Sequence, residues 1–328
     1  MNELLILTNS YDATTDVLLD RLRETSVFRL NFDQITKYSL RFNRDGFDIS
    51  DPTGRTVSSK TVRKAYWRKP FNAENEEPEI CTKYVDAEMR YVLTEMVNLL
   101  WSEQKLVLVE PFAERRTGKL LQLRHAQGLF AIPEYEVVLN EEPFTSAAVV
   151  KSLSNELVSD RVLYTTKVRT DDLDLRYPWF VEQYITATHD VTVVFVREQL
   201  FAFSLERDFL KKTIDWRQCI SPEQKWTRHS LPSCLSTAII AYMKALKLDY
   251  SRFDFLLDEQ QRYWFCEVNP NGQFAWLDLS GEQGLLDAVI QEISPTSELH
   301  PIPNRHPLEL ATQTSSRSDL KKETEIPV

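Results

Sequence analysis

Apolar positions in the first third of the chain alternate between short continuous runs and helical spacing, a pattern typical of an α/β region. The run 4–7 is followed by apolar residues at helical spacing and then by a second strand-like run, 27–35. The turn after the first run, "TNSYDATTD", contains no glycine, which argues against a Rossmann dinucleotide site. A long amphipathic helix is predicted over 78–102, where it would cover the first sheet.

The pattern changes between about 131 and 204, where successive strand-like segments predict a largely antiparallel region. The segments are "EYEVVL", "AAVVKSL", "VLYTTKV", "WFVEQYI", "DVTVVFV" and "LFAFSL". A helix predicted over 231–246 then precedes two strands, "SRFDFLLD" and "RYWFCEV", joined by the turn "DEQQ". After about residue 295 the chain is rich in Ser, Thr, Pro and charged residues, so we expect a flexible tail.

These changes of pattern divide the chain into four parts. We expect an N-terminal α/β domain over 1–114, a central antiparallel domain over 115–204, a C-terminal domain over 205–294 and the tail over 295–328. The predicted fold class is therefore α+β.

Composition and charge narrow the function. The formal net charge of −10 argues against a nucleic-acid binder that relies on neutralising phosphates, and favours a small-molecule or peptide substrate. The four cysteines lack CxxC spacing, so neither a zinc site nor a disulfide framework is indicated. The first residues lack the pattern of a signal peptide, and no apolar window is long enough to cross a bilayer, so we expect a cytoplasmic protein with no membrane partner.

The stretch "YWFCEVNPNG" places a carboxylate and an amide, Glu267 and Asn269, two residues apart at the end of an aromatic strand. Side chains alternate along a strand, so both project from one face. Pairing with the preceding strand would bring Asp254 to the same sheet end. Three oxygen ligands of this kind suit Mg²⁺ completed by water and phosphate oxygens, which implies a nucleotide triphosphate partner.

Positive charge for such phosphates is available in the middle of the chain. Lys151 lies in the strand "AAVVKSL", where alternation leaves open whether it faces an anion or solvent. The strand end "WFVEQYI" offers backbone groups for an adenine edge, and Arg217 in "TIDWRQC" offers a rigid donor to a phosphate or an acyl phosphate.

The order of these features resembles the ATP-grasp fold. More narrowly, "AYWRKPF", "KLLQLRHAQ…IPEY", "DWR", "FDFLL" and "EVNPNGQFAWLDL" resemble the ATP-grasp ribosomal peptide maturases that make graspetides, the microviridin-type macrocyclases. This resemblance implies a pre-ATP-grasp N-terminal domain and ATP and Mg²⁺ as cofactors. It also implies a ligase that forms ADP and phosphate, a ribosomal precursor peptide as substrate, and a homodimer.

The implied reaction activates an Asp or Glu side chain of the precursor as an acyl phosphate, which a Ser, Thr or Lys side chain displaces to close an ester or amide macrocycle. By this resemblance, phosphate binding falls on Lys119 and Lys151, and the adenine hinge on Glu182, Gln183, Tyr184 and Ile185. Mg²⁺ binding falls on Asp254, Glu267 and Asn269, and acyl-phosphate binding on Arg217. Among these, Arg217 and Lys151 are the expected catalytic residues.

One departure from the family pattern concerns the strand after the hinge. The family commonly has an acidic, an apolar and an arginine residue there, whereas this chain has Asp190, Val191 and Thr192. Either Arg207 or Arg217 compensates for the missing arginine in holding phosphate, or the enzyme treats its acyl phosphate differently, or the chain has lost catalysis. Two alternatives stay open: an ATP-grasp amino-acid ligase resembling the ribosomal-protein glutamate ligases or glutathione synthetase, and a non-catalytic peptide-binding partner, which the missing arginine supports. The helix around Tyr84 and Tyr91 would serve either a dimer interface or the core, and we expect core.

Overall fold

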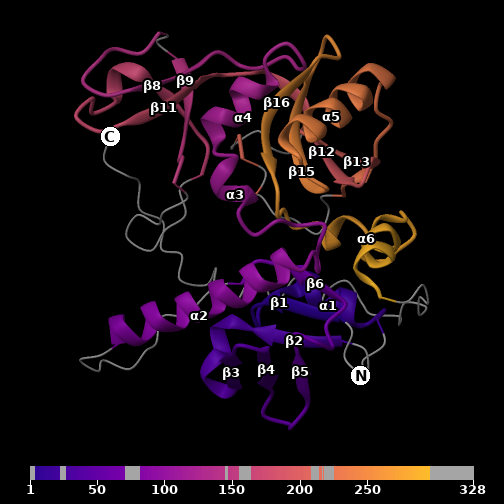
Figure 1. Ribbon diagram of the computed structural model, residues 1–328. Coiled ribbons are helices and arrows are strands. Elements are labelled where there is room, and N and C mark those ends of the chain that lie inside the picture. The colour runs from indigo at the N-terminus through magenta and orange to yellow at the C-terminus, as the bar shows by residue number, and fades with distance from the viewer. Residues whose placement is uncertain are drawn as a thin grey trace.

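The N-terminal part of the chain forms a parallel sheet, seen at the bottom of Figure 1. In this computed structural model the described residues are 4–22, 27–70, 82–144, 147–154, 164–207, 214–215, 217 and 225–295. The parallel strands, in the spatial order β2-β1-β6-β7, are β2 (Val27–Asn31), β1 (Leu4–Thr8), β6 (Lys64–Trp67) and β7 (Leu106–Val107). A small antiparallel sheet beside them consists of β3 (Ser39–Asn43), β4 (Gly46–Ser50) and β5 (Thr56–Ser58).

Helices cover both faces of the parallel sheet because its strands are apolar on both sides, as buried parallel strands are. On one face, Leu5 and Leu7 pack in one cluster with Met96 and Leu100 of α2 (Thr82–Ser102). On the other face the sheet packs against α1 (Ala13–Leu19) and α6 (Leu285–Ile293). This second cluster also includes residues of the C-terminal sheet, so it joins the two ends of the chain (Figure 1). The predicted βαβ opening is confirmed.

The central part is an antiparallel sheet with the spatial order β10-β9-β11-β8. Its strands are β8 (Tyr135–Val138), β9 (Ala147–Lys151), β10 (Thr166–Arg169) and β11 (Trp179–Gln183). Two short helices lead into it, α3 (Ala113–Arg116) and α4 (Lys119–Ala126). Short 3-10 helical segments occur at Phe32–Lys37, Thr170–Asp172 and Ala275–Leu277.

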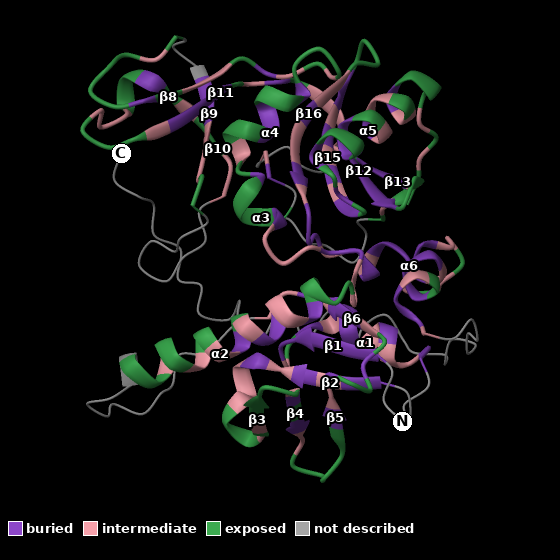
Figure 2. Ribbon diagram, viewed as in Figure 1, coloured by how far each residue is buried: buried purple, intermediate pink, exposed green. Residues whose placement is uncertain are grey.

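The C-terminal sheet has five antiparallel strands in the order β14-β13-β12-β15-β16. They are β12 (Ala187–Val196), β13 (Gln199–Glu206), β14 (Thr227–Arg228), β15 (Tyr250–Asp258) and β16 (Tyr263–Asn269), with α5 (Ser233–Leu246) on one face. An aromatic cluster containing Phe130, Tyr242, Phe253 and Phe265 fills the space between this sheet, α4 and α5. The buried core of the sheet is purple in Figure 2.

Two expectations differ from the structure. The sheet continues across the boundary predicted at residue 204, because β12 pairs with β15 as well as with β13, so the change of sheet lies between β11 and β12. Tyr84 and Tyr91 are not core residues: 68% and 67% of their surfaces are exposed on α2. Most of the predicted tail, from residue 296 onward, lies outside the described residues. None of the described helices has the length and apolarity needed to span a membrane.

Candidate functional site

A cavity of about 230 Å³ lies between the central and C-terminal sheets, near the lower end of small-molecule pockets. Most of the sequence-predicted site residues line it. These are Lys119, Lys151, Glu182, Gln183, Tyr184, Ile185, Arg217, Asp254 and Glu267. They come from six separate segments of the chain: α4, β9, the end of β11, β15, β16 and the segment that precedes β14.

The predicted metal-binding strands pair as expected. Asp254 on β15 lies directly opposite Glu267 on β16, and a β-bulge follows this pair. Asn269 does not line the cavity; its side-chain Oδ1 accepts a hydrogen bond from the backbone N–H of Asn271 at 3.0 Å. Among the described residues, no three His, Cys, Asp or Glu side chains gather into a metal cluster. Within this cavity a magnesium ion would therefore rely on the two carboxylates, completed by water and phosphate.

Every lysine and arginine that lines the cavity forms an ion pair with a carboxylate of the same cavity. The pairs are Lys119 with Glu267 at 3.2 Å, Arg252 with Asp254 at 2.9 Å, Arg207 with Asp190 at 2.8 Å, Arg217 with Asp215 at 2.6 Å, and Lys151 with Glu182. Charges removed from water are costly unless paired, so each cationic side chain of the cavity has a carboxylate that offsets its charge in a partly desolvated space.

Lys151 faces inward, which excludes the solvent-facing alternative. Its side chain is 17% exposed, and its amino group contacts Glu182, whose side chain is 1% exposed. Burial by itself lowers the pKa of Lys151, but the Glu182 carboxylate outweighs that effect and the pKa is raised. Cys266 lies close by, where burial raises the pKa of its thiol to about 12 despite the nearby Lys151 charge. The thiol is therefore neutral and no nucleophile.

Lys119 reaches the metal-binding strand because α4 is attached to β16. The side chain of Gln122, one turn further along α4, accepts a hydrogen bond from the backbone N–H of Val268 at 3.0 Å. The hydroxyl of Tyr242 donates to the Gln122 carbonyl at 3.1 Å. These buried bonds hold the first residue of the helix beside Glu267. As a result the pKa of Glu267 is lowered, because the lysine and arginine charges around it outweigh its burial.

The predicted adenine hinge runs from β11 into the cavity wall. Glu182 and Gln183 end the strand, where the backbone N–H of Gln183 donates to Glu134 at 2.8 Å. Tyr184 and Ile185 follow, and the amino group of Lys167 lies 3.9 Å from the centre of the Tyr184 ring. Ile185 is 9% exposed and offers an apolar surface on which a purine ring can pack.

Sequence reasoning missed Arg252 and did not assign Asp190 a role. Arg252 is two residues before Asp254 on the same face of β15, so the period-two spacing in "SRFDF" was a signal that could have identified it. Burial raises the pKa of Asp190 to about 6, against the opposing effect of the Arg207 charge. Arg207, considered as a substitute for the missing arginine, does line the cavity.

Thr192, where the resemblance leads one to expect arginine, is 1% exposed. Its hydroxyl lies 2.9 Å from Oδ1 of Asp254 and donates to the carbonyl of Phe253 at 3.1 Å. It therefore orients the carboxylate of Asp254 toward the cavity. Arg252 contacts the other carboxylate oxygen of Asp254, so a guanidinium from the neighbouring strand is present at this point of the site.

Comparison with solved structures shows which proteins share this fold. The Chryseobacterium gregarium RiPP-associated ATP-grasp ligase, in complex with ADP and a leader and core peptide, is 22% identical, with a TM-score of 0.76 over 89% of this chain and 96% of that chain. Macrocyclase MdnC from Microcystis aeruginosa, bound with precursor peptide MdnA, is 21% identical, with a TM-score of 0.74 over 89% and 98%.

More distant ligases share the same topology. D-alanine–D-alanine ligase from Bacillus anthracis is 13% identical, with a TM-score of 0.51 over 97% of this chain and 99% of that chain. No protein-family model matches the chain, and no curated protein matches it. The fold expected from the sequence is confirmed: the chain has the ATP-grasp fold, in the form found in RiPP macrocyclases.

Proposed function

We propose that this chain is an ATP-dependent ligase that activates Asp or Glu side chains of a ribosomally made precursor peptide and closes side-chain ester or amide rings. One cavity, in an ATP-grasp fold like that of the macrocyclases, carries the proposal. In this cavity Lys119, Lys151, Arg217 and Arg252 each contact a carboxylate, and the segment suited to adenine lies beside them. In this reaction a substrate carboxylate oxygen attacks the terminal phosphorus of ATP and ADP leaves. A hydroxyl or amine then attacks the acyl carbon, losing its proton, and phosphate leaves.

The residues present fit a magnesium ion. Asp254 and Glu267 are adjacent across two strands, and Asn269 projects on the same face two residues beyond Glu267. Carboxylate and amide oxygens are the ligands that Mg²⁺ prefers, and the bound ion would neutralise phosphate charge. Lys119 and Arg252, which pair with these carboxylates, would then contact phosphate oxygens. Transfer of a phosphoryl group needs mainly such positioning and charge neutralisation, so a protein nucleophile is not required.

Lys151 and Arg217 are the proposed catalytic residues. The amino group of Lys151 is held in the cavity by Glu182, where it can donate to a phosphate. The guanidinium of Arg217 is held by two bonds to Asp215, which raise its pKa and keep its planar fork fixed. A fixed fork suits the oxygens of an acyl phosphate. Trp216, in the same "DWR" motif, lies outside the described residues.

Two further features belong to the same proposal. We expect the precursor's leader to bind the central sheet, whose outer strands β10 and β8 have free edges among the described strands and can extend the sheet by strand addition.

We also expect a cytoplasmic homodimer. The aromatic residues exposed on α2, Tyr84, Tyr91 and Trp101, support a surface for a second copy, since exposed aromatic groups are enriched at interfaces. Light scattering on the purified protein and on Tyr91→Lys tests this interface.

The experiment that tests the function is the intact mass of the small peptide encoded beside this gene, incubated with the protein, ATP and Mg²⁺ while ADP is followed. Loss of water from the peptide with one ADP per water supports macrocyclisation. A gain of amino-acid mass when free amino acids are added supports the amino-acid ligase instead. Unchanged peptide that still binds supports the non-catalytic partner, the alternative that the absent arginine at position 192 favours. Glu267→Gln is the control that should abolish turnover.

A further inference from the structure

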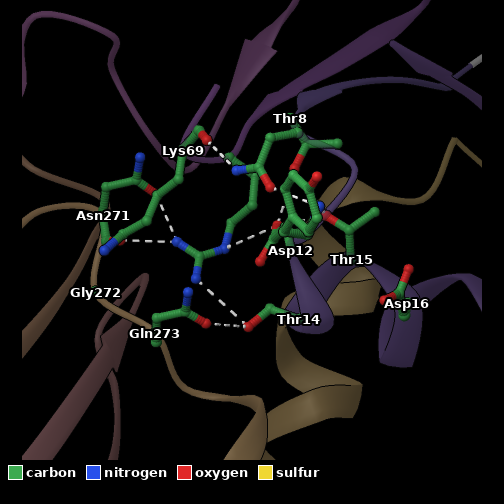
Figure 3. Close-up of polar contacts among 12 residues, drawn as sticks. Thr8, Asp12, Thr14, Thr15, Asp16, Lys69, Asn271, Gly272 and Gln273 are labelled. Carbon is green, nitrogen blue, oxygen red and sulfur yellow. Dashed lines mark hydrogen bonds and ion pairs between the residues drawn. The ribbon is translucent and has the colours of Figure 1, made fainter. Parts of the chain in front are cut away.

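The N-terminal sheet contributes no residue to the described wall of the cavity, yet it is bonded to the metal-binding strand through a buried arginine. Arg68 follows β6, and its side chain is 0% exposed. Figure 3 shows the surroundings: Asp12 and Thr14 on one side, and Asn271 to Gln273, the turn after β16, on the other. The motif "AYWRKPF", which the site described above leaves without a role, therefore lies between two parts of the chain that are distant in sequence.

On the side of the turn, Arg68 holds the backbone and the side chain of one residue. Its Nη1 donates to the carbonyl oxygen of Asn271 at 2.7 Å and to Oδ1 of the same residue at 2.9 Å. Asn271 is itself 2% exposed. Hydrogen bonds from a charged donor are stronger than neutral ones, and two on one residue fix both its position and its orientation.

On the side of the N-terminal sheet, Arg68 is held by α1. Its Nε lies 3.7 Å from Oδ2 of Asp12, an oxygen that also accepts from the hydroxyls of Thr8 at 3.0 Å and Thr15 at 2.6 Å. Thr14 completes the contact, since its hydroxyl lies 2.9 Å from Oε1 of Gln273. The turn is thus bonded to the N-terminal sheet at both Asn271 and Gln273.

The turn in its own right is bonded to the predicted metal ligands. The backbone N–H of Asn271 donates to Oδ1 of Asn269, and Arg252 bonds both the carbonyl of Gln273 at 3.2 Å and the carboxylate of Asp254 at 2.9 Å. Gly272 passes so close that a Cβ there would lie 2.7 Å from the Cβ of Arg252. The turn therefore has little room to move without moving these side chains.

We propose that Arg68 is a positioning residue for the metal-binding end of β16: it holds the turn 269–273 so that Asn269, Glu267 and Asp254 keep the spacing that Mg²⁺ requires. Partners that orient metal ligands typically change metal affinity 10- to 100-fold when they are replaced. This inference rests on the proposed function, because it assumes that the strand end binds Mg²⁺ with a nucleotide.

The test measures ADP binding calorimetrically, with and without Mg²⁺, for the wild type, Arg68→Lys, Asn271→Ala and the control Arg21→Lys. Arg68→Lys keeps a positive charge but removes Nη1, the atom that donates both hydrogen bonds to Asn271. Arg21 is a matched control because it is a buried arginine, 7% exposed, that also joins α1 to the C-terminal part, through Asp287 at 2.7 Å, without touching the turn.

We expect Arg68→Lys to need about 10- to 100-fold more Mg²⁺ for ADP binding, with binding in the absence of Mg²⁺ changed less than about twofold. Asn271→Ala leaves the arginine and its charge in place and should shift the Mg²⁺ requirement in the same direction. This variant carries the test if Arg68→Lys does not fold. Arg21→Lys should leave both measurements unchanged.

A purely structural role would reduce the fraction of folded protein and lower both binding signals together without changing the Mg²⁺ requirement, and that result overturns the inference. Unchanged Mg²⁺ dependence in both turn variants overturns it as well. A wild type that binds ADP with no dependence on Mg²⁺ overturns the proposed metal site and this inference with it, so the two failures are distinguishable.

Discussion

The amino group of Lys119, the first residue of α4, lies 3.2 Å from Oε2 of Glu267 on β16. The resemblance assigned one of these groups to phosphate and the other to Mg²⁺, and the structure places them in contact. Under the proposed function, Lys119 would pass from Glu267 to a phosphate when the nucleotide binds, and Glu267 would pass from Lys119 to the ion. The pair therefore keeps the charges ready in a site where unpaired charges would be costly.

Glu267→Gln should reduce turnover on the precursor peptide at least about 100-fold, because it removes a carboxylate that would hold the ion that stabilises charge during phosphoryl transfer. Raising Mg²⁺ should restore part of the activity. Coupled measurement of ADP release over a range of Mg²⁺ concentrations tests this. Glu259→Gln, at an exposed position in the turn between β15 and β16, is the control. Equal activity of the two variants would remove Glu267 from the metal site.

Lys151→Met should destabilise the fold by about 3–5 kcal/mol, because it leaves the buried carboxylate of Glu182 without its partner. The double variant Lys151→Met, Glu182→Leu removes both charges and should recover most of that loss. Urea unfolding of the wild type, both single variants and the double variant gives the coupling energy. Additive effects would show that the pair does not interact in solution.

The pH dependence of stability should reveal Asp190. Burial raises its pKa to about 6 from its ordinary value of 3.8, so between these pH values the folded protein binds more protons than the unfolded chain. Its contribution to the free energy of unfolding is then greatest below about pH 4 and is lost as pH rises through 6. Relative to Asp190→Asn, the wild type should lose on the order of 2–3 kcal/mol between pH 4 and 7. A constant difference between the two proteins over this range would contradict the shift.

Alkylation should distinguish the two described cysteines. Cys234 is exposed on α5, whereas burial raises the pKa of Cys266 to about 12. The thiolate is the reactive form, so at pH 8 iodoacetamide should modify Cys234 at least about 100-fold faster. Mass spectrometry of peptides containing each cysteine measures the two rates, and unfolding in urea should make them similar. Rapid reaction of Cys266 in the folded protein would show that this wall of the cavity is open.

Local pattern determined those features that depend on the period of the chain. The strands around Asp254 and Glu267 and their joining turn follow from alternation and turn residues, because a strand exposes every second side chain to the same face. The same spacing puts Arg252 beside Asp254. The helix ending at Ser102 was predicted equally well, since helical spacing of apolar residues extends over its whole length.

Tertiary structure alone decided which charges meet and which apolar residues are covered. Pairing of β12 with β15 moved two strands into the C-terminal sheet, because antiparallel strands can pair with any neighbour that matches their burial. Tyr84 and Tyr91 are exposed on α2, whereas Leu93 and Met96 of the same helix pack against the sheet, so only the packing decided which face of the helix is covered. The contact between Arg68 and Asn271 depends on two segments, far apart in sequence, that meet only after the N-terminal and C-terminal sheets pack together. No local pattern in either segment encodes that meeting.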